Sequence, residues 1–276
     1  FQTGLKNLMD RAIISRTEKE AKEHVILQNL DTSFQKIDEL PFDFERRRMS
    51  VIVKDDSNVV SMVTKGALEE MLTISTHVEY RGEIIPITEG IRQEVLAEVG
   101  QLNRQGLRVL GVGYKSGLRE DYAYAVTDES DMILTGYLAF LDPPKPSAAP
   151  AIQALLEHGV RTKILTGDNE KVTQAICEKV GLDVEQMLLG ADIDQMTDQE
   201  LAEVVEKVTV FAKLSPDQKA RIILQLKRNG HAVGYMGDGI NDAPSMKVAD
   251  VGISVDTAVD IAKETADVIL LDKDLM

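Results

Sequence analysis

The sequence predicts an α/β protein whose two halves are built differently. From about Leu141 onward, short apolar segments alternate with helical segments of about ten to fifteen residues, which is typical of a parallel sheet covered by helices. The first half has strand-like segments joined by tight turns, which favours an antiparallel sheet with a few helices. A length of 276 residues also fits two domains better than one. We therefore expect one domain over residues 1–140 and a second over residues 141–276.

The elements of the first half are defined by strand-like runs and one helical run. The expected strands cover residues 46–56, 61–72, 77–88 and 107–117, and the expected helix covers 89–106. The connection that follows, residues 141–146, reads "LDPPKP". Its prolines exclude an ordinary helix there and predict a stiff hinge between the two halves.

The second half predicts helices that end at glycines and strands made of short apolar runs. Ser215 fits the N-cap of one helix, Pro216 fits its first position and Gly230 fits its end. The expected helices cover 146–159, 168–181, 197–208, 215–230 and 257–266, and the expected strands cover 160–166, 209–214, 231–236, 250–255 and 267–271. Ligands of such sheets gather at the carboxyl ends of the strands.

The composition narrows the class of partner. The chain has 46 acidic and 31 basic residues and a net charge of -15, which argues against nucleic acid or an anionic membrane surface as its main partner. No apolar run reaches the roughly 18 to 20 residues that a membrane span needs. The single cysteine, Cys177, excludes an internal disulfide, fits a reducing cytosolic setting and is expected to be buried.

Two polar loops follow strands of the second half. The loop in "KILTGDNE" carries Thr166, Gly167 and Asp168, and the loop in "GYMGDGIND" carries Gly237, Asp238, Gly239, Asn241 and Asp242. Glycines let main-chain N–H groups approach an anion, and a threonine hydroxyl adds a donor. Carboxylates beside an anion require a hard cation between them, so Asp238 and Asp242 suggest Mg²⁺. With Lys219 as a fixed positive charge, these groups suit phosphoryl transfer.

Each of these signals is weak when taken alone. A "TGD" segment is a common turn, an aspartate-glycine pair marks a tight turn more often than a metal site, and a single lysine on a helix is usually solvated. The joint arrangement on successive units of one sheet, and the density of "GDGINDAP", favour the functional interpretation.

The motifs "KGALE", "LDPPK", "ILTGD" and "MGDGINDAP" stand in the order found in the P-type cation-transporting ATPases, which the chain resembles over essentially its whole length. The sequences of the segments "FQTGLKNLMDRAI", "FDFERRRMSV" and "GYLAFLDPPK" most resemble the magnesium-transporting branch of that family. The resemblance implies that the first half is an antiparallel-sheet nucleotide-binding domain. It implies that the second half is a phosphorylation domain with a haloacid-dehalogenase-like, Rossmann-like fold that lacks its first strand.

The resemblance also implies roles for residues of the second half. Asp238 would bind the catalytic Mg²⁺, and Asp242 would support the loop and its ion. Thr166 and Gly167 would hold the transferred phosphoryl group, and Lys219 would offset its charge. Asp168 would help to organise the loop of Thr166, and Asn241 would hydrogen-bond nearby. Asp142 in the hinge would help to position the nucleotide.

In the first half, the resemblance implies a pocket for ATP or ADP. Phe42 would stack on adenine, and Arg47 would reach the phosphates from the same strand. Lys65 and Gly66 of "KGALE" would lie beside the base and phosphates, and Arg108 would contact the phosphate tail. Without the resemblance, Phe42 reads as a core aromatic and the "ERRR" run as a solvated face.

The Asp-Lys-Thr-Gly-Thr sequence that carries the phosphorylated aspartate in this family is absent. The chain also opens without an initiator methionine, so we expect a segment of a longer pump, with that aspartate upstream of Phe1. The segment would bind nucleotide without turnover and would be soluble, at the cytoplasmic face of the plasma or inner membrane, next to the membrane and actuator domains of the same pump. A rival interpretation is a soluble haloacid-dehalogenase-like phosphatase that uses Asp272 as its nucleophile.

Overall fold

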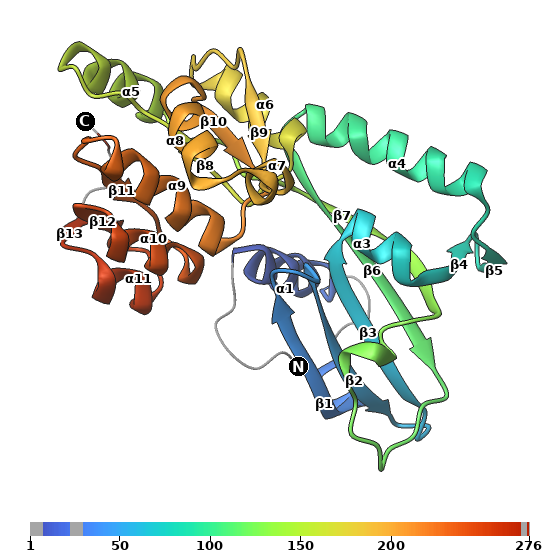
Figure 1. Cartoon of the computed structure of the whole chain (residues 1–276). Coiled ribbons are helices and arrows are strands. Elements are labelled where there is room, and N and C mark those ends of the chain that lie inside the picture. Colours follow the sequence, from blue (N-terminus) through green and yellow to red (C-terminus); the bar gives the residue numbers. More distant parts are fainter. Residues whose placement is uncertain (1–7, 23–29, 272–274, 276) are drawn as a thin grey trace. The chain divides into compact units, whose positions relative to one another are not determined.

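The computed structural model describes residues 8–22, 30–271 and 275. The chain divides into two compact units (Figure 1). The first comprises Phe1–Leu102 with Leu107–Phe140, and the second comprises Asn103–Gly106 with Leu141–Met276. Among the described residues, no helix combines the length and the apolar character needed to cross a membrane.

The first unit is built on one seven-stranded sheet in the order β1-β2-β3-β6-β7-β4-β5. Its strands are β1 (Phe34–Asp43), β2 (Arg48–Asp55), β3 (Val60–Ala67), β4 (Ser75–Tyr80), β5 (Glu83–Pro86), β6 (Leu107–Ser116) and β7 (Met132–Leu141). The pairs β1–β2, β2–β3, β3–β6 and β4–β5 are antiparallel, and β4 runs parallel to β7. The expected antiparallel sheet is therefore confirmed, with one parallel pair near its edge.

Helices cover both faces of this sheet. They are α1 (Leu8–Glu20), α2 (Leu30–Ser33), α3 (Leu68–Ile74), α4 (Glu89–Arg104) and the 3₁₀ turn η2 (Val126–Asp128). On the face of α3 and α4, buried Met71 and Leu72 pack with Val99 and Leu134. On the opposite face, Lys65 of β3 forms an ion pair with Asp10 of α1.

Two expected strands of the first half were too long. The segment 77–88 is a hairpin, with β4 ending at Tyr80, a turn at Arg81 and Gly82, and β5 beginning at Glu83. The segment 61–72 is a strand only to Ala67, and α3 begins at Leu68. Leu68, Met71 and Leu72 are all buried, so the apolar spacing changes from the period of a strand to that of a helix at this point. The elements α1, β1 and β7 were not expected from the sequence.

The second unit contains two three-stranded parallel sheets, β8-β10-β9 and β11-β12-β13. The strands are β8 (Ile164–Leu165), β9 (Met187–Leu189), β10 (Val210–Ala212), β11 (Gly234–Met236), β12 (Val251–Val255) and β13 (Val268–Leu270). The sequence predicted the parallel direction correctly. It did not predict that the strands would be shorter than their apolar runs or that they would form two sheets.

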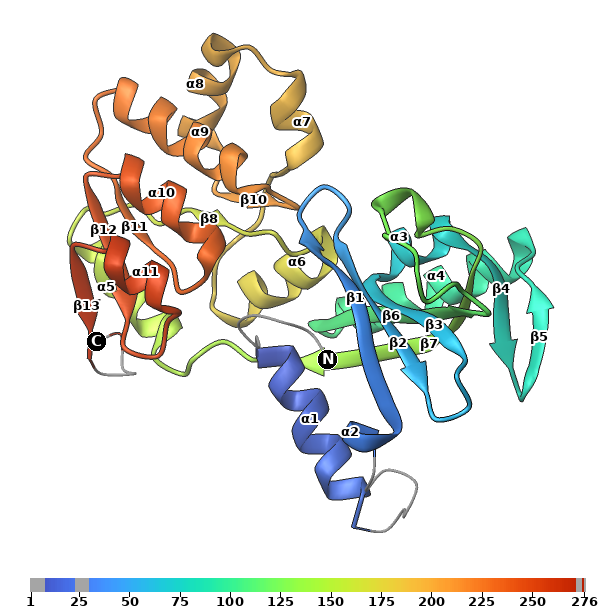
Figure 2. The same ribbon diagram turned by 90° about the horizontal axis from the view of Figure 1, so that it is seen from below.

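Five helices of the second unit follow the predicted alternation: α5 (Ala148–Glu157), α6 (Glu170–Lys179), α8 (Asp198–Lys207), α9 (Pro216–Arg228) and α11 (Asp260–Thr265). The sequence did not predict α7 (Gly190–Gln195), η3 (Ile240–Asp242) or α10 (Ala243–Val248). Figures 1 and 2 show β11, β12 and β13 side by side, with α10 and α11 against them. The Ser215 cap is confirmed, since its hydroxyl accepts the N–H of Gln218 while the Gln218 side chain accepts the N–H of Ser215.

Two apolar clusters form the core of the second unit. One surrounds Phe211 of β10, and the other surrounds Tyr235 of β11. Leu165 of β8 and Val233, just before β11, pack against both clusters. These shared contacts bring the β8 side of one sheet next to the β11 side of the other. Cys177 is buried on α6, as predicted.

Candidate functional site

The first predicted loop of the second unit leaves the end of β8. The Thr166 hydroxyl accepts the N–H of Asp168 at 3.1 Å, which closes a tight turn. The carbonyl of Thr166 accepts the N–H of Leu214 at 3.0 Å, and the carbonyl of Asp168 accepts the N–H of Lys213 at 2.7 Å. The loop is therefore fastened to the segment that leads into α9. Gly167 is exposed at its tip.

The second predicted loop follows β11 and is built around Asp242. One carboxylate oxygen, Oδ1, accepts from Lys219 Nζ at 2.9 Å and from the Tyr235 hydroxyl at 2.6 Å. The other, Oδ2, accepts the N–H of Gly239 at 3.1 Å. Asp242 is 9% exposed and Lys219 is 8% exposed. The interpretation of Lys219 as a solvated helix residue is therefore wrong.

These contacts link the two loops through α9. The Thr166–Asp168 loop is bonded to residues 213 and 214, α9 begins directly after Ser215, and Lys219 in the first turns of α9 reaches Asp242. Asp238 is exposed and Asn241 is half-buried within the second loop. The groups predicted from the sequence thus belong to one connected set.

Burial and charge act in opposite directions on Asp242. Burial would raise the pKa of its carboxyl, but the Lys219 ammonium, the Tyr235 hydroxyl and the Gly239 N–H together hold that pKa below its usual value. Burial and the neighbouring Asp242 charge raise the pKa of Tyr235, so its hydroxyl stays protonated and donates. Asp242 is therefore an ionised brace for the loop.

Gly237 is required at the start of this loop. A Cβ atom there would lie 2.5 Å from Cβ and 2.6 Å from Cγ of Asp242. Real Cβ atoms do not approach this closely, so any side chain at position 237 would displace the Asp242 brace.

The second loop offers one exposed carboxylate to a magnesium ion. Within the described ranges, no three or more His, Cys, Asp or Glu side chains are grouped for a metal ion. Asp242 already accepts from three donors, which leaves exposed Asp238 as the carboxylate suited to direct binding. Mg²⁺ is commonly held by one or two carboxylates, with phosphate oxygens and waters completing the octahedron.

In the first unit, the predicted nucleotide residues gather at one end of the sheet. Alternating strand directions bring together the end of β1, the start of β2, the end of β3 and the start of β6. The residues at this end are Phe42, Arg47, Lys65, Gly66 and Arg108. They come from three strands and the turn between β1 and β2, yet they lie at the same end of the sheet.

Phe42 lies at the end of β1 and is 49% exposed, so its interpretation as a core aromatic is wrong. Its ring meets the ring of Phe44 edge to face, with centroids 5.1 Å apart. The placement of Arg47 in the same strand is also wrong. Arg47 lies in the turn between β1 and β2, and its φ of 50° puts it in the left-handed region, which a non-glycine residue rarely adopts.

Gly66 allows the turn and β3 to approach each other closely. A Cβ atom at this position would lie 2.4 Å from Cβ of Arg48 and 2.7 Å from the carbonyl oxygen of Arg47. The next residue, Ala67, donates its N–H to that same carbonyl at 3.0 Å. The glycine of "KGALE" therefore brings Arg47 against the end of β3.

Asp142 follows β7 and is exposed. Residues 142–145 form neither helix nor strand, which confirms that the prolines exclude a helix there. Asp272, the nucleophile of the rival interpretation, lies outside the described residues.

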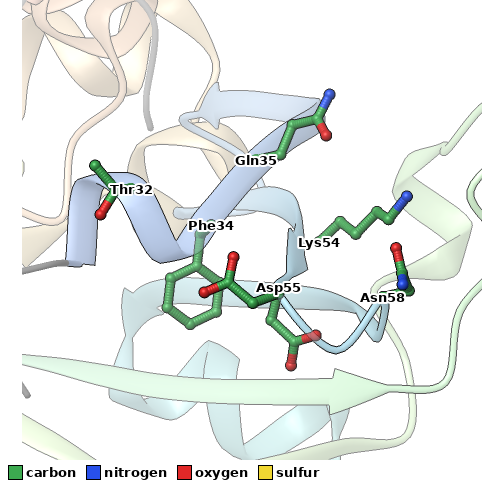
Figure 3. Close-up of a pocket in the computed structure, with 7 residues that line it drawn as sticks. Thr32, Phe34, Gln35, Lys54, Asp55 and Asn58 are labelled. Atoms are coloured by element: carbon green, nitrogen blue, oxygen red, sulfur yellow. The ribbon is translucent and has the colours of Figure 1, made fainter.

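A shallow hollow of about 340 Å³ lies at the other end of β1 and β2 (Figure 3). It is lined by Thr32, Phe34, Gln35, Lys54, Asp55, Asp56 and Asn58. Lys54 is paired with Glu120 at 2.9 Å, and Asp55 accepts the N–H groups of Ser57 and Val59, each at 2.9 Å. Because these groups already have partners, we assign no ligand to the hollow.

Comparison with known proteins shows which family the chain belongs to. The family model described as "P-type ATPase, cytoplasmic domain N" matches residues 4–147, which is more than half of the chain. The chain belongs to the P-type ATPase family. Proteins named "Magnesium-transporting ATPase, P-type 1" are 51% identical in Salmonella typhimurium and 50% identical in Escherichia coli (strain K12), over 276 residues and 100% of this chain.

A protein named "Calcium-transporting ATPase" from Bacillus subtilis is 32% identical over 246 residues, which cover 88% of this chain and 28% of that protein. The chain spans only 30% of the length of the magnesium-transporting relatives. As a P-type ATPase segment, the first unit corresponds in large part to the region that the family model describes as cytoplasmic domain N.

Proposed function

We propose that this chain is the ATP-binding and partial phosphorylation region of a P-type ATPase that moves Mg²⁺ across a membrane. Residues 1–140 form its nucleotide-binding domain and residues 141–276 most of its phosphorylation domain. The single observation that carries the proposal is the gathering of Phe42, Arg47, Gly66 and Arg108 at one sheet end in a chain that belongs to this family.

In the first unit, half-exposed Phe42 offers an aromatic face on which adenine stacks. Arg47, Lys65 and Arg108 supply positive charge for the phosphates, and Gly66 lets the nucleotide approach the backbone. Asp142, just after this domain, helps to position the nucleotide. ATP or ADP is therefore the ligand of this unit.

In the second unit, Thr166 and Gly167 hold the phosphoryl group, Asp168 helps to organise their loop, and Asn241 forms hydrogen bonds nearby. Lys219 offsets the charge of the phosphoryl group from the position that Asp242 gives it. Asp238 binds Mg²⁺ and Asp242 supports that loop. Mg²⁺, when bound, neutralises charge on the phosphoryl oxygens.

The fold of the second unit is proposed to be haloacid-dehalogenase-like, with one further parallel strand between β8 and β11. The proposal is supported by two observations: β8 and β11 are end strands of their sheets, and Leu165 and Val233 beside them share contacts with both apolar clusters. That strand would carry the aspartate that receives the γ-phosphoryl group in the intact pump, next to its membrane and actuator domains at the cytoplasmic face.

The test is ATP binding by this chain, measured by isothermal titration calorimetry. Stacking of a base on an aromatic contributes about 1 to 3 kcal/mol, so Phe42→Ala is expected to weaken binding about tenfold. Tyr80→Ala is the matched control, because Tyr80 is also an exposed aromatic of this sheet but lies on β4. Equal ATP affinity in the Phe42→Ala variant and the parent chain would refute the assignment.

A second experiment tests whether this chain itself is phosphorylated by ATP. After incubation with γ-labelled ATP and acid quench, this chain is expected to carry no acid-stable label, whereas an intact pump of this family does. Stoichiometric label on this chain that disappears in an Asp272→Ala variant would favour the phosphatase instead.

A further inference from the structure

Glu129 is a fully buried carboxylate in the first unit, placed between η2 and β7. Its Oε2 accepts from Arg46 Nη1 at 2.6 Å and from Arg48 Nε at 2.7 Å. Its Oε1 accepts the hydroxyl of Ser50 at 2.7 Å, which in turn lies 2.7 Å from the hydroxyl of Thr64. Burial would raise the pKa of Glu129, but Arg46, Ser50 and Arg48 together hold it below its usual value.

The two arginines flank Arg47 in the sequence and lie at the two sides of the turn that carries it. Arg46 also donates through Nη2 to the carbonyl of Pro41 at 2.7 Å, directly before Phe42. Glu129 therefore connects, through one arginine, to the end of β1 and, through the other, to the start of β2. Phe42 and Arg47, the two residues proposed to contact the nucleotide here, lie between the segments that Arg46 and Arg48 connect to Glu129.

The backbone of the turn is strained and is held by several contacts. Arg47 holds a left-handed φ of 50°, a conformation that persists only when surrounding contacts enforce it. The N–H of Arg47 donates to the carbonyl of Asp43 at 2.7 Å, and the Asp43 side chain accepts the N–H of Arg46 at 2.8 Å. Local bonds therefore close the turn, and Glu129 fixes it to the rest of the unit.

A purely structural role is the alternative explanation for this cluster. The opposite end of β2 offers a comparison, because Lys54 there joins Glu120 in a single pair whose carboxylate is 48% exposed. Removing charges from water costs free energy, and this cost can cancel the attraction between them. A buried ion pair is therefore not explained by stability alone. The carboxylate that is fully buried with two arginines lies at the nucleotide end of the sheet, whereas the pair at the other end is exposed. This difference favours a role for Glu129 in nucleotide binding.

We propose that Glu129 is a positioning residue of the nucleotide site, which sets the affinity for ATP by holding the Phe42–Arg47 turn without touching the ligand. The inference rests on the proposed function of the first unit. It concerns a residue more than 80 positions along the chain from the turn, since Glu129 is 83 residues from Arg46 and 81 from Arg48.

The experiment measures ATP affinity of the 276-residue chain by calorimetry, with circular dichroism to verify folding. Glu129→Gln keeps the size of the side chain and removes its charge, and it is expected to weaken ATP binding about tenfold. Glu120→Gln is the matched control on the far end of β2 and is expected to leave the affinity unchanged.

A double-mutant cycle separates positioning from general destabilisation. If Glu129 acts through the turn, Glu129→Gln and Phe42→Ala remove the same contribution, and the double variant binds ATP about as weakly as Phe42→Ala alone. Additive losses in a folded protein would show that Glu129 acts independently of Phe42 and would overturn the inference. Equal affinity of Glu129→Gln and the parent chain would also overturn it.

Arg46→Lys keeps the protein testable if Glu129→Gln does not fold. Lysine retains the charge but lacks the fork that lets Arg46 reach both Glu129 and the Pro41 carbonyl. A folded Arg46→Lys variant is expected to lose affinity severalfold, and parent-like affinity would overturn the inference. Absence of ATP binding by the parent chain would refute the proposed function itself, together with this inference.

Discussion

Lys219 Nζ lies 2.9 Å from Asp242 Oδ1, and this ion pair joins α9 to the loop after β11. Both side chains are almost removed from solvent. The Tyr235 hydroxyl donates to the same oxygen at 2.6 Å. The predicted site residues Lys219 and Asp242 therefore stabilise each other. Their ion pair holds the conformation of the loop that carries Asp238.

Breaking this pair is expected to destabilise the second unit. Lys219→Met leaves the Asp242 carboxylate buried beside an apolar side chain, which should lower the free energy of unfolding by about 3 kcal/mol. The Lys219→Met/Asp242→Asn double variant should recover part of that loss, since neither charge remains buried. Urea unfolding followed by circular dichroism measures both effects.

An exposed pair in the same unit is the control for that prediction. Asp260 of α11 lies 3.2 Å from Lys263 and its side chain is 85% exposed. Asp260→Asn should change the free energy of unfolding by less than about 0.5 kcal/mol. If Lys219→Met unfolds at the same urea concentration as Asp260→Asn, the buried pair is not a brace.

Local sequence signals predicted much of this second unit. The Ser215 cap, the proline after it and the alternation of strands with helices are encoded within a few residues, and the structure has them. The separation into two sheets depends on packing between distant segments, as the shared contacts of Leu165 and Val233 illustrate. No local pattern of residues carries that information.

The first unit was harder to predict from its sequence. Strand β1 contains Pro41 and several charged residues, which disfavour a strand, but it lies at the edge of the sheet where proline is tolerated. The sequence also gave no signal for Glu129, because its partners lie on another segment of the chain and the segment around it is irregular. The pairing of Asp10 with Lys65 was missed for the same reason.

Replacement of Lys65 tests the charge at the nucleotide end of the sheet. Lys65→Met is expected to weaken ATP binding about tenfold, because charge-assisted hydrogen bonds contribute about 1.5 to 3 kcal/mol. It should also destabilise the unit, since Asp10 of α1 is buried and loses this ion pair. Calorimetry and urea unfolding measure the two effects separately.

The Lys65→Met/Asp10→Asn double variant distinguishes binding from folding. It should regain part of the unfolding free energy while its ATP affinity stays low. Lys54→Met, at the far end of β2, should bind ATP as the parent chain does. Recovery of ATP affinity in the double variant would mean that Lys65 acts on stability alone.

Acid sensitivity of the first unit should depend on Glu129. Its pKa in the folded chain lies below the ordinary value of 4.5, so the folded state binds fewer protons than the unfolded state. Its contribution is therefore fully present above pH 4.5 and is lost as the pH falls through the folded pKa. Glu129→Gln should show a flatter dependence of unfolding free energy on pH below that point.

The control for the pH experiment is Asp198→Asn. Asp198 is exposed and lies between Arg221 and Arg228, at 3.0 and 2.8 Å, so solvent screens its interactions. Its removal should alter the pH dependence less than removal of the buried Glu129. Parallel curves for Glu129→Gln and the parent chain would contradict the stabilising role of the ionised carboxylate.

Gly66→Ala tests whether close approach at the end of β3 shapes the turn. The new Cβ would lie 2.4 Å from Cβ of Arg48, so β2 and β3 must separate locally. Overpacking of this kind costs about 1 to 3 kcal/mol of unfolding free energy, and the displaced turn should bind ATP less tightly. Gly90→Ala, in the exposed first turn of α4 with its nearest atom at 3.8 Å, should change the free energy of unfolding by less than about 0.5 kcal/mol. If both variants keep parent-like stability and ATP affinity, the turn tolerates a wider gap and Gly66 is not what sets the position of Arg47.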